Sequence, residues 1–188
     1  MVERIVTAGR AVLIERGFDG ATTNRIAEAA GISPGSLYQY FPDKEAILAE
    51  VVDRYADQIA ARVTAHLTTQ IGTPDEATAI RQTIAVLLDA MDEQPELLRA
   101  TFEHTPRLGV GDKIAAFEQR VGDIAIAHMR LRAQPLSRSA TASWLGVRTV
   151  EHLTIRYLLD RPPIDRDEFI DELSTLVFSY THSPAVPK

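Results

Sequence analysis

The sequence predicts an all-α protein of about nine helices, in which a small N-terminal domain of short helices precedes a larger bundle of longer ones. Apolar residues recur at three- and four-residue spacing along nearly all of the 188 residues, as they do where one face of each helix is buried. The alternation of apolar and polar residues that marks half-buried strands is missing. Proline and glycine interrupt the pattern at intervals, and each interruption predicts a boundary between two helices.

Three short helices are expected at the start of the chain. They take roughly 2–16, Thr22 or Thr23 to about Ala30, and Ser33 to about Phe41. Gly17 is the predicted stop of the first, because glycine adopts the left-handed backbone common at helix ends, and Phe18 is then expected to fold back beneath that helix. Ser33 is a good N-cap for the third helix, and Pro34 suits its first position.

Longer helices follow, beginning with one that Asp43 caps and that continues to about Thr69. Five more are expected near 75–92, 95–103, 111–132, 136–160 and 166–181, with loops at 72–74, 94–95, 106–111, 134–135 and 161–163. The change in helix length predicts two domains, residues 1–48 and 49–188, with the fourth helix shared between them.

Composition narrows the class and location of the protein. Cysteine is absent, so disulfides, thiolate metal sites and cysteine nucleophiles are excluded. The first residues carry charges at Glu3, Arg4 and Arg10, where a secretory signal would be apolar. No stretch approaches the roughly 18 apolar residues of a membrane span. We therefore expect a cytoplasmic protein with no bound metal and no cofactor.

The segment from Thr22 to Leu48 has the pattern of a helix-turn-helix, two short helices joined by a tight turn. Ala27 and Ala30 are small enough for the helices to cross closely, and Gly31 tolerates the backbone of the turn. A buried wedge is expected from Ile26, Ile32, Leu37 and Phe41. The polar residues of the second of these helices are then free to face a groove of DNA.

This segment closely resembles the TetR family of one-component repressors. The central part of the family pattern, I-A-x-x-A-G-(V/I)-S-x-G-x-(L/I)-Y-x-(Y/H)-F-x-x-K, is matched at every fixed position from Ile26 to Lys44. The resemblance is close from Thr23 to Leu48 and looser in the first helix, through Arg10, Gly17 and Phe18, and together these parts cover about a quarter of the chain. It implies a DNA-binding transcriptional regulator that acts as a homodimer, and in most relatives a repressor that a small-molecule effector releases from its operator.

The resemblance also implies which residues contact DNA. Four are expected at base edges: Pro34, Gly35, Tyr38 and Gln39. Four others are expected at phosphates, where contacts set register rather than sequence specificity: Thr23, Ser36, Tyr40 and Lys44. Tyr38 suits a thymine methyl and Gln39 suits adenine, while Ser33 caps the same helix. Arg25 is a further candidate that the family pattern does not specify. Packing is the alternative role for Tyr38, and a place on the solvated surface is the alternative for Gln39, Tyr40 and Arg25.

Net charge limits how such a protein binds DNA. The chain carries −6 at pH 7, and residues 1–50 hold five basic against seven acidic residues, a net charge of −2. Phosphate contacts need Lys and Arg to replace released counterions. Binding must therefore depend on a few placed cations together with hydroxyl and amide donors, and we expect modest non-specific affinity.

The resemblance implies that the C-terminal domain dimerises and binds the effector. Dimer contacts are expected within about 136–181, where two helices carry more apolar surface than one core face needs. A fully internal core is the alternative explanation. Effector contacts are expected among the fourth to eighth helices, with these candidates: Phe102, His104, Phe117, Val121, Trp144 and Arg148. A structural role is the alternative for each of them, and the sequence does not indicate what the effector is.

Two other classes compete with the regulator. The first is an enzyme, in which the pairs Glu103–His104 and Glu151–His152 could act in acid–base catalysis. However, adjacent residues on a helix do not face each other. The sequence also has no nucleophile elbow, phosphate-binding glycine loop or HExxH motif. A ligand carrier or interaction module without DNA binding is favoured only by the acidic charge of the first 50 residues. We therefore expect a regulator and not an enzyme.

Overall fold

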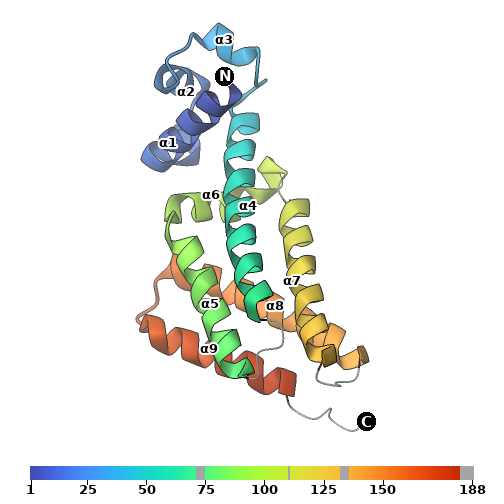
Figure 1. Cartoon of the computed structure of the whole chain (residues 1–188). Helices are drawn as coiled ribbons and strands as arrows, with labels where there is room; N and C mark the ends of the chain where they lie inside the picture. The colour runs from blue at the N-terminus through green and yellow to red at the C-terminus, as the bar shows by residue number, and fades with distance from the viewer. Residues whose placement is uncertain (71–74, 110, 132–135, 183–188) are drawn as a thin grey trace. The chain divides into compact units, whose positions relative to one another are not determined.

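The computed structural model describes residues 1–70, 75–109, 111–131 and 136–182. All regular structure within them is helical (Figure 1), which confirms the predicted all-α class. The helices of these residues are α1 (Val2–Gly20), α2 (Thr23–Ala29), α3 (Pro34–Tyr38), α4 (Lys44–Gln70), α5 (Glu76–Asp92), α6 (Pro95–Leu108), α7 (Gly111–Leu131), α8 (Leu136–Asp160) and α9 (Arg166–His182). None of these described helices has the length and apolar character needed to cross a membrane.

Helix α1 is bent at the predicted stop rather than ended there. Gly17 has φ 69° and ψ 176°, so it interrupts the helix, but a further short helical stretch reaches Gly20. The backbone N–H of Ala21 then donates to the Gly17 carbonyl at 3.1 Å. Phe18 is only 5% exposed, as expected for a side chain folded back beneath the helix.

Helices α3 and α6 end elsewhere than predicted. The N–H groups of Tyr40 and Phe41 both donate to the Leu37 carbonyl, at 2.9 and 3.1 Å. The chain therefore turns after α3, and the prediction that this helix reaches Phe41 was wrong. The loop expected from residue 106 was also wrong, because α6 continues to Leu108. A proline removes one helix hydrogen bond, whereas the positive φ of 67° at Gly109 is incompatible with a continuing α-helix.

The chain forms two compact units. The first unit contains residues 1–58 and 94–114, and the second unit contains residues 59–93 and 115–188. Helices α1, α2, α3 and α6 thus belong to the first unit, while α5, α8 and α9 belong to the second. The functional division into residues 1–48 and 49–188 stays a prediction, because compact packing does not define function.

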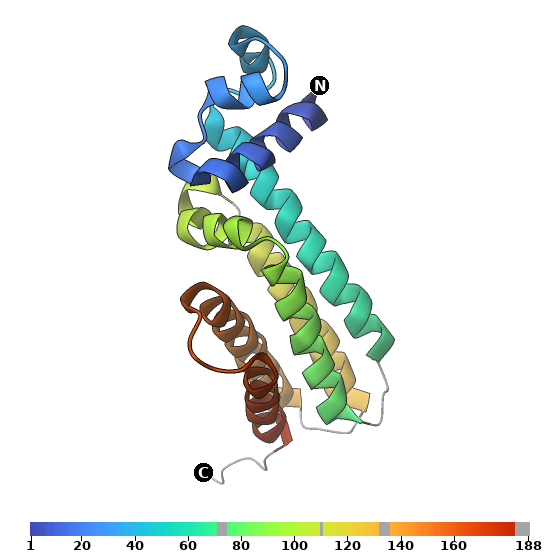
Figure 2. The ribbon, with the colours of Figure 1, turned by 90° about the vertical axis from the view of Figure 1, so that its left-hand side faces the viewer.

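Each unit has an apolar core of its own. In the first unit, α1 packs on α2 and on α6, and the largest fully buried side chains are Ile5, Leu13, Ile26, Leu37, Ile47, Leu48, Val52 and Leu97. In the second unit, α5, α8 and α9 lie against one another (Figures 1 and 2). Their shared cluster is centred on Ile84, Leu88, Ile170 and Leu173. Burial of each such aliphatic side chain contributes about 1.5–3 kcal/mol.

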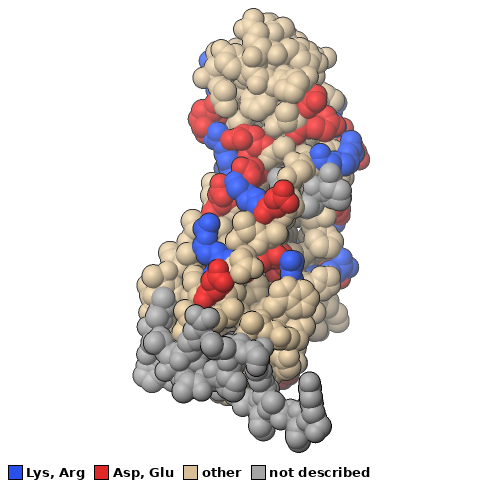
Figure 3. All heavy atoms as spheres, turned by 90° about the vertical axis from the view of Figure 1, so that its right-hand side faces the viewer, with Lys and Arg blue, Asp and Glu red and all other residues tan. Residues whose placement is uncertain are grey.

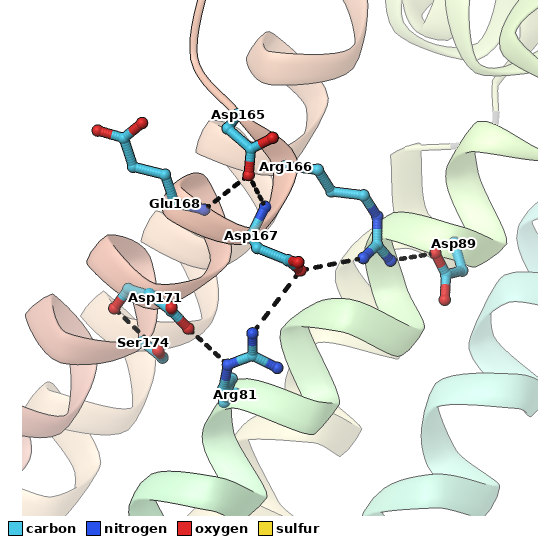
Figure 4. A network of polar contacts seen from close by, with 8 residues as sticks. All are labelled: Arg81, Asp89, Asp165, Arg166, Asp167, Glu168, Asp171 and Ser174. Atoms are coloured by element: carbon cyan, nitrogen blue, oxygen red, sulfur yellow. Dashed lines mark hydrogen bonds and ion pairs between the residues drawn. The ribbon is translucent and has the colours of Figure 1, made fainter.

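A network of ion pairs joins α5 to the start of α9 at the surface of the second unit (Figure 4). Arg81 pairs with Asp171 at 2.5 Å and with Asp167 at 3.7 Å. Arg166 pairs with Asp89 and, at 3.6 Å, with Asp167. All of these side chains are largely exposed, so each pair contributes only about 0–1 kcal/mol. The network therefore fixes orientation more than it stabilises the unit.

The conformation of Gly17 leads to a stability prediction. A side chain at φ 69° and ψ 176° enters a region that only glycine populates freely, at a cost of about 1–3 kcal/mol. Gly17→Ala should lower the free energy of unfolding by that amount in a chemical denaturation experiment. Gly35→Ala is the control, since no atom comes nearer than 3.9 Å to the added Cβ there. Equal stability of the two variants would contradict the prediction.

Candidate nucleic-acid interface

The helix-turn-helix of the first unit is built from two capped helices. Thr22 Oγ1 accepts a hydrogen bond from the Arg25 backbone N–H at 3.3 Å, at the start of α2. Ser33 Oγ accepts one from the Ser36 backbone N–H at 3.1 Å, at the start of α3. Each cap satisfies a backbone donor that the helix start otherwise leaves unpaired. The expected cap at Ser33 is confirmed, and Thr22 is the cap of the two threonines considered.

Burial of one side chain determines which face of α3 is exposed. Leu37 of α3 and Ile26 of α2 are both 0% exposed, and the two helices pack against each other. Ile32 and Phe41, expected in the same wedge, are half-buried. Because Leu37 points inward, the opposite side of α3 is open to solvent. The four residues expected at base edges are all exposed: Pro34, Gly35, Tyr38 and Gln39.

Tyr38 and Thr23 come together from the two helices. The Tyr38 side chain is 53% exposed, and its hydroxyl lies 3.2 Å from Thr23 Oγ1, within hydrogen-bond distance. The bond restricts the orientation of an exposed aromatic ring that solvent alone would leave free. Thr23 and Tyr38 were expected at a phosphate and at a base edge respectively, and the structure places them at adjoining points of one surface.

The remaining hydroxyl groups of this surface lie at both ends of α3. The Ser33 and Ser36 hydroxyl oxygens are 2.9 Å apart and share a hydrogen bond. Ser36 is half-buried, whereas Tyr40, just beyond the end of α3, is exposed. Ser36 thus lies in α3 with most of the residues expected at base edges, while Ser33 directly precedes this helix and Tyr40 follows it.

The two expected cations are held by backbone carbonyls. Arg25 Nη1 donates to the Gly20 carbonyl at 2.6 Å. Lys44 Nζ donates to the Phe18 carbonyl at 3.1 Å and lies 5.0 Å from the centroid of the Phe18 ring. Arg25 is exposed and Lys44 is half-buried. Sequence reasoning did not foresee the contact with Phe18, since nothing in the spacing of residues 18 and 44 indicates it.

The surface around α3 carries few charges. No Asp, Glu, Lys or Arg occurs in residues 29–42. In the face drawn in Figure 3, the surface of the α2 and α3 region is accordingly almost free of blue and red atoms. Attraction to phosphates must therefore come from cations outside this segment.

The six residues expected at an effector do not gather in one unit. Phe102 and His104 belong to the first unit, where the His104 ring stacks on Phe18 with a centroid distance of 3.9 Å. The other four belong to the second unit. Of these, Phe117 and Val121 are half-buried on α7. On α8, Trp144 is 61% exposed, and Arg148 forms an ion pair with Glu118.

The partner of Arg148 is part of a carboxyl pair that sequence reasoning missed. Glu118 of α7 is only 7% exposed, and Arg148 also lies 3.5 Å from Glu151 of α8. Burial, together with a hydrogen bond to Glu118 and the charge of that carboxylate, raises the pKa of Glu151 to about 8, although Arg148 acts in the opposite direction. Glu151 is thus a proton-bearing carboxyl at neutral pH, while Glu118 takes the closer contact with the guanidinium.

Other chemistry is limited in the part of the chain that the structure describes. There, no three His, Asp or Glu side chains are grouped closely enough to hold a metal ion. The exposed face of a capped two-helix motif is instead the geometry of a helix-turn-helix DNA-binding protein.

Comparison with known proteins identifies the family. Residues 5–51 match the model for bacterial regulatory proteins of the tetR family, and residues 75–180 match the tetracyclin repressor-like C-terminal domain. The chain therefore belongs to the TetR family of DNA-binding transcriptional regulators, as its helix-turn-helix predicted. Members of this family are regulators and not enzymes.

Individual relatives agree with this assignment. The chain is 26% identical to the HTH-type transcriptional activator FasR of Mycolicibacterium smegmatis, over 98% of this chain and 83% of that protein. A tetR-family transcriptional regulator from Streptomyces coelicolor has a similar fold, with a TM-score of 0.74 at 18% identity over 96% of this chain and 82% of that one. Thermus thermophilus FadR, a TetR-family repressor in complex with lauroyl-CoA, has a TM-score of 0.60 at 21% identity over 100% and 98%.

The raised pKa of Glu151 leads to a pH prediction. Below the ordinary pKa of 4.5, the carboxyl is protonated in both the folded and the unfolded chain. Between 4.5 and about 8, the unfolded chain has lost a proton that the folded chain retains. The free energy of unfolding should therefore fall as pH rises through this window and level off above it.

Chemical denaturation from pH 5 to pH 9 tests this expectation. Glu151→Gln keeps a neutral side chain of similar shape at every pH, so its stability should fall less across the window than that of the unaltered protein. Glu168→Gln removes an exposed carboxylate of the same unit and should leave the fall intact. An equal fall in the unaltered protein and in Glu151→Gln would show that this group is not responsible.

Proposed function

We propose that this regulator binds a pseudo-palindromic operator as a homodimer, and that one α3 from each protomer enters a major groove. The observation that supports this most directly is the exposed face of α3 opposite the buried Leu37. A recognition helix has to offer side chains to base edges while its other face is fixed in the core. Two such helices related by a two-fold axis match two half-sites.

The residues of this face are assigned to bases or to phosphates according to the chemistry of their side chains. Tyr38 and Gln39 contact bases, Tyr38 through its ring against a thymine methyl and Gln39 through its amide to adenine. Pro34 and Gly35 leave room for close approach to the bases. The phosphates meet the side chains of Thr23, Arg25, Ser33, Ser36, Tyr40 and Lys44. The bond between Tyr38 and Thr23 supports this division, because it links a base contact to a phosphate contact.

The second chain is proposed to pack on α8 and α9, within about 136–181. Both helices expose large apolar side chains that a monomer would leave in water. They are Trp144, Leu145 and Leu153 on α8, and Leu176 and Tyr180 on α9. A symmetric contact through these helices would bury the apolar surface of both protomers at once.

A small-molecule effector is proposed to bind within the second unit and to release the protein from DNA. Three buried polar atoms of that unit have no hydrogen-bond partner among the described residues: Thr64 Oγ1, His66 Nε2 and Thr154 Oγ1. Buried polar groups are nearly always paired, so polar groups of a ligand would satisfy them. Repression is proposed because most members of the family act as repressors. The relative FasR is named an activator. A reporter assay would therefore determine whether this protein represses or activates transcription.

The DNA-binding part of the proposal is tested with Tyr38→Ala. Fluorescence anisotropy is measured with labelled DNA from upstream of the protein's own gene and with a randomised duplex pool. Loss of a base contact worth about 1–3 kcal/mol should weaken selective binding at least about fivefold. Tyr38→Phe keeps the ring and should retain most of the affinity. Ile164→Ala, a comparably exposed apolar side chain of the second unit, is the control. Selective binding unaffected by Tyr38→Ala would contradict the assigned role.

The dimer surface is tested with Leu176→Glu. A carboxylate placed in an apolar interface remains buried without a partner, so the dissociation constant of the dimer should rise at least about 30-fold, or about 2 kcal/mol. Analytical ultracentrifugation over a concentration series measures it. Ile14→Glu introduces the same charge at an exposed position of the first unit, outside the proposed interface, and should leave the dimer intact. A Leu176→Glu protein that associates as tightly as the control would place the interface elsewhere.

A further inference from the structure

The cations of the first unit fall into two groups. The unit contains nine Lys and Arg residues. Five of them form ion pairs with carboxylates: Arg16 with Glu15, Arg54 with Glu3 and Glu50, Arg99 with Glu103, Arg107 with Glu45, and Lys113 with Asp53 and Asp57. A carboxylate beside a cation cancels most of its attraction for a phosphate. These five residues therefore contribute little to DNA binding.

The other four cations have neutral acceptors instead. They are Arg4, Arg10, Arg25 and Lys44, and no ion pair joins any of them to a carboxylate of the described residues. Arg4 Nη2 donates to the Gly31 carbonyl at 3.3 Å, and Arg10 Nε donates to Gln94 Oε1 at 3.1 Å. A neutral acceptor orients a cation without cancelling its charge. Arg25 and Lys44 already belong to the proposed interface, which leaves Arg4 and Arg10 without a role.

The hydrogen-bond acceptors of Arg4 and Arg10 lie in different parts of the first unit. Gly31 lies in the turn that joins α2 to α3, two residues before the Ser33 cap. The hydrogen bond therefore holds the exposed guanidinium of Arg4 beside the helix-turn-helix. Gln94, in contrast, directly precedes α6, so the hydrogen bond of Arg10 holds it at the start of α6 and not at the turn. The neighbour of Arg4 in the sequence, Glu3, does not cancel its charge, because that carboxylate lies 2.6 Å from Arg54.

We propose that Arg4 is a further DNA contact, which binds a phosphate next to the half-site that α3 enters. This proposal rests on the proposed function. A guanidinium has five N–H donors, and the bond to Gly31 occupies only one of them. The segment 29–42 is uncharged, so attraction to the DNA backbone depends on cations around it. Arg4 adds one from α1 to those that Arg25 and Lys44 supply.

The salt dependence of DNA binding tests the proposal. Anisotropy titrations of the full chain, from low to moderate KCl, use the labelled upstream duplex and a random-sequence duplex. Each phosphate contact contributes about 0.9 to the slope of log K against log salt concentration. Arg4→Gln should therefore reduce the magnitude of the slope by about 1.8 for a dimer. Arg16→Gln removes the same charge from the same helix, where Glu15 already cancels it, and should leave the slope unchanged. Arg10→Gln should also leave it unchanged.

A conservative variant separates charge from structure. Arg4→Lys keeps the positive charge but not the planar fork, so it should retain the slope of the unaltered protein. If Arg4 only held the turn in place, Arg4→Gln would lower affinity without changing the slope, and this result would overturn the proposal. Loss of the slope contribution in Arg4→Lys as well would also overturn it. Absence of DNA binding by the unaltered protein would reject the proposed function and the Arg4 contact together.

Discussion

The bend at Gly17 is the constraint on which the first unit depends. A residue with φ 69° turns the chain so that Phe18 is buried and the carbonyls after the bend become available. Those carbonyls accept hydrogen bonds from the backbone of Ala21 and from the side chains of Arg25 and Lys44. The Phe18 ring stacks on His104 of α6 and lies 5.0 Å from the Lys44 ammonium. One backbone conformation therefore fixes the position of cations from two other helices.

The two units differ in how completely their polar groups are paired. In the first unit, carbonyls and carboxylates of the described residues account for most Lys and Arg side chains. In the second unit, buried atoms of Thr64, His66 and Thr154 have no partner among the residues that the structure describes, and Glu118 and Glu151 share a single guanidinium. A core of this kind is less stable than an apolar one of the same volume. This lower stability is typical of a region that interacts with another molecule.

Local features of the fold could be predicted from the sequence, and long-range contacts could not. The caps at Thr22 and Ser33 and the interruption at Gly17 follow from the preferences of single residues, which act within a few positions of the chain. The end of α6 was missed because a proline was given more weight than the glycine three residues later.

In the candidate site too, local features could be predicted from the sequence and long-range contacts could not. Exposure of Tyr38 and Gln39 follows from their spacing relative to Leu37. The contacts of Lys44 with Phe18, Arg4 with Gly31, and Glu118 with Arg148 join residues 26 to 30 positions apart. Charge and residue type alone do not indicate which of many possible partners such a side chain meets.

The absence of charge in residues 29–42 has a consequence for how this protein can diverge. The proposed base contacts lie on an uncharged helix, while the cations proposed to attract any DNA lie on α1, α2 and α4. Substitutions on the exposed face of α3 would therefore change the preferred operator without altering the general attraction to chromosomal DNA. Duplicated copies of the gene would acquire separate targets by a few replacements, each copy retaining the same search behaviour along the genome.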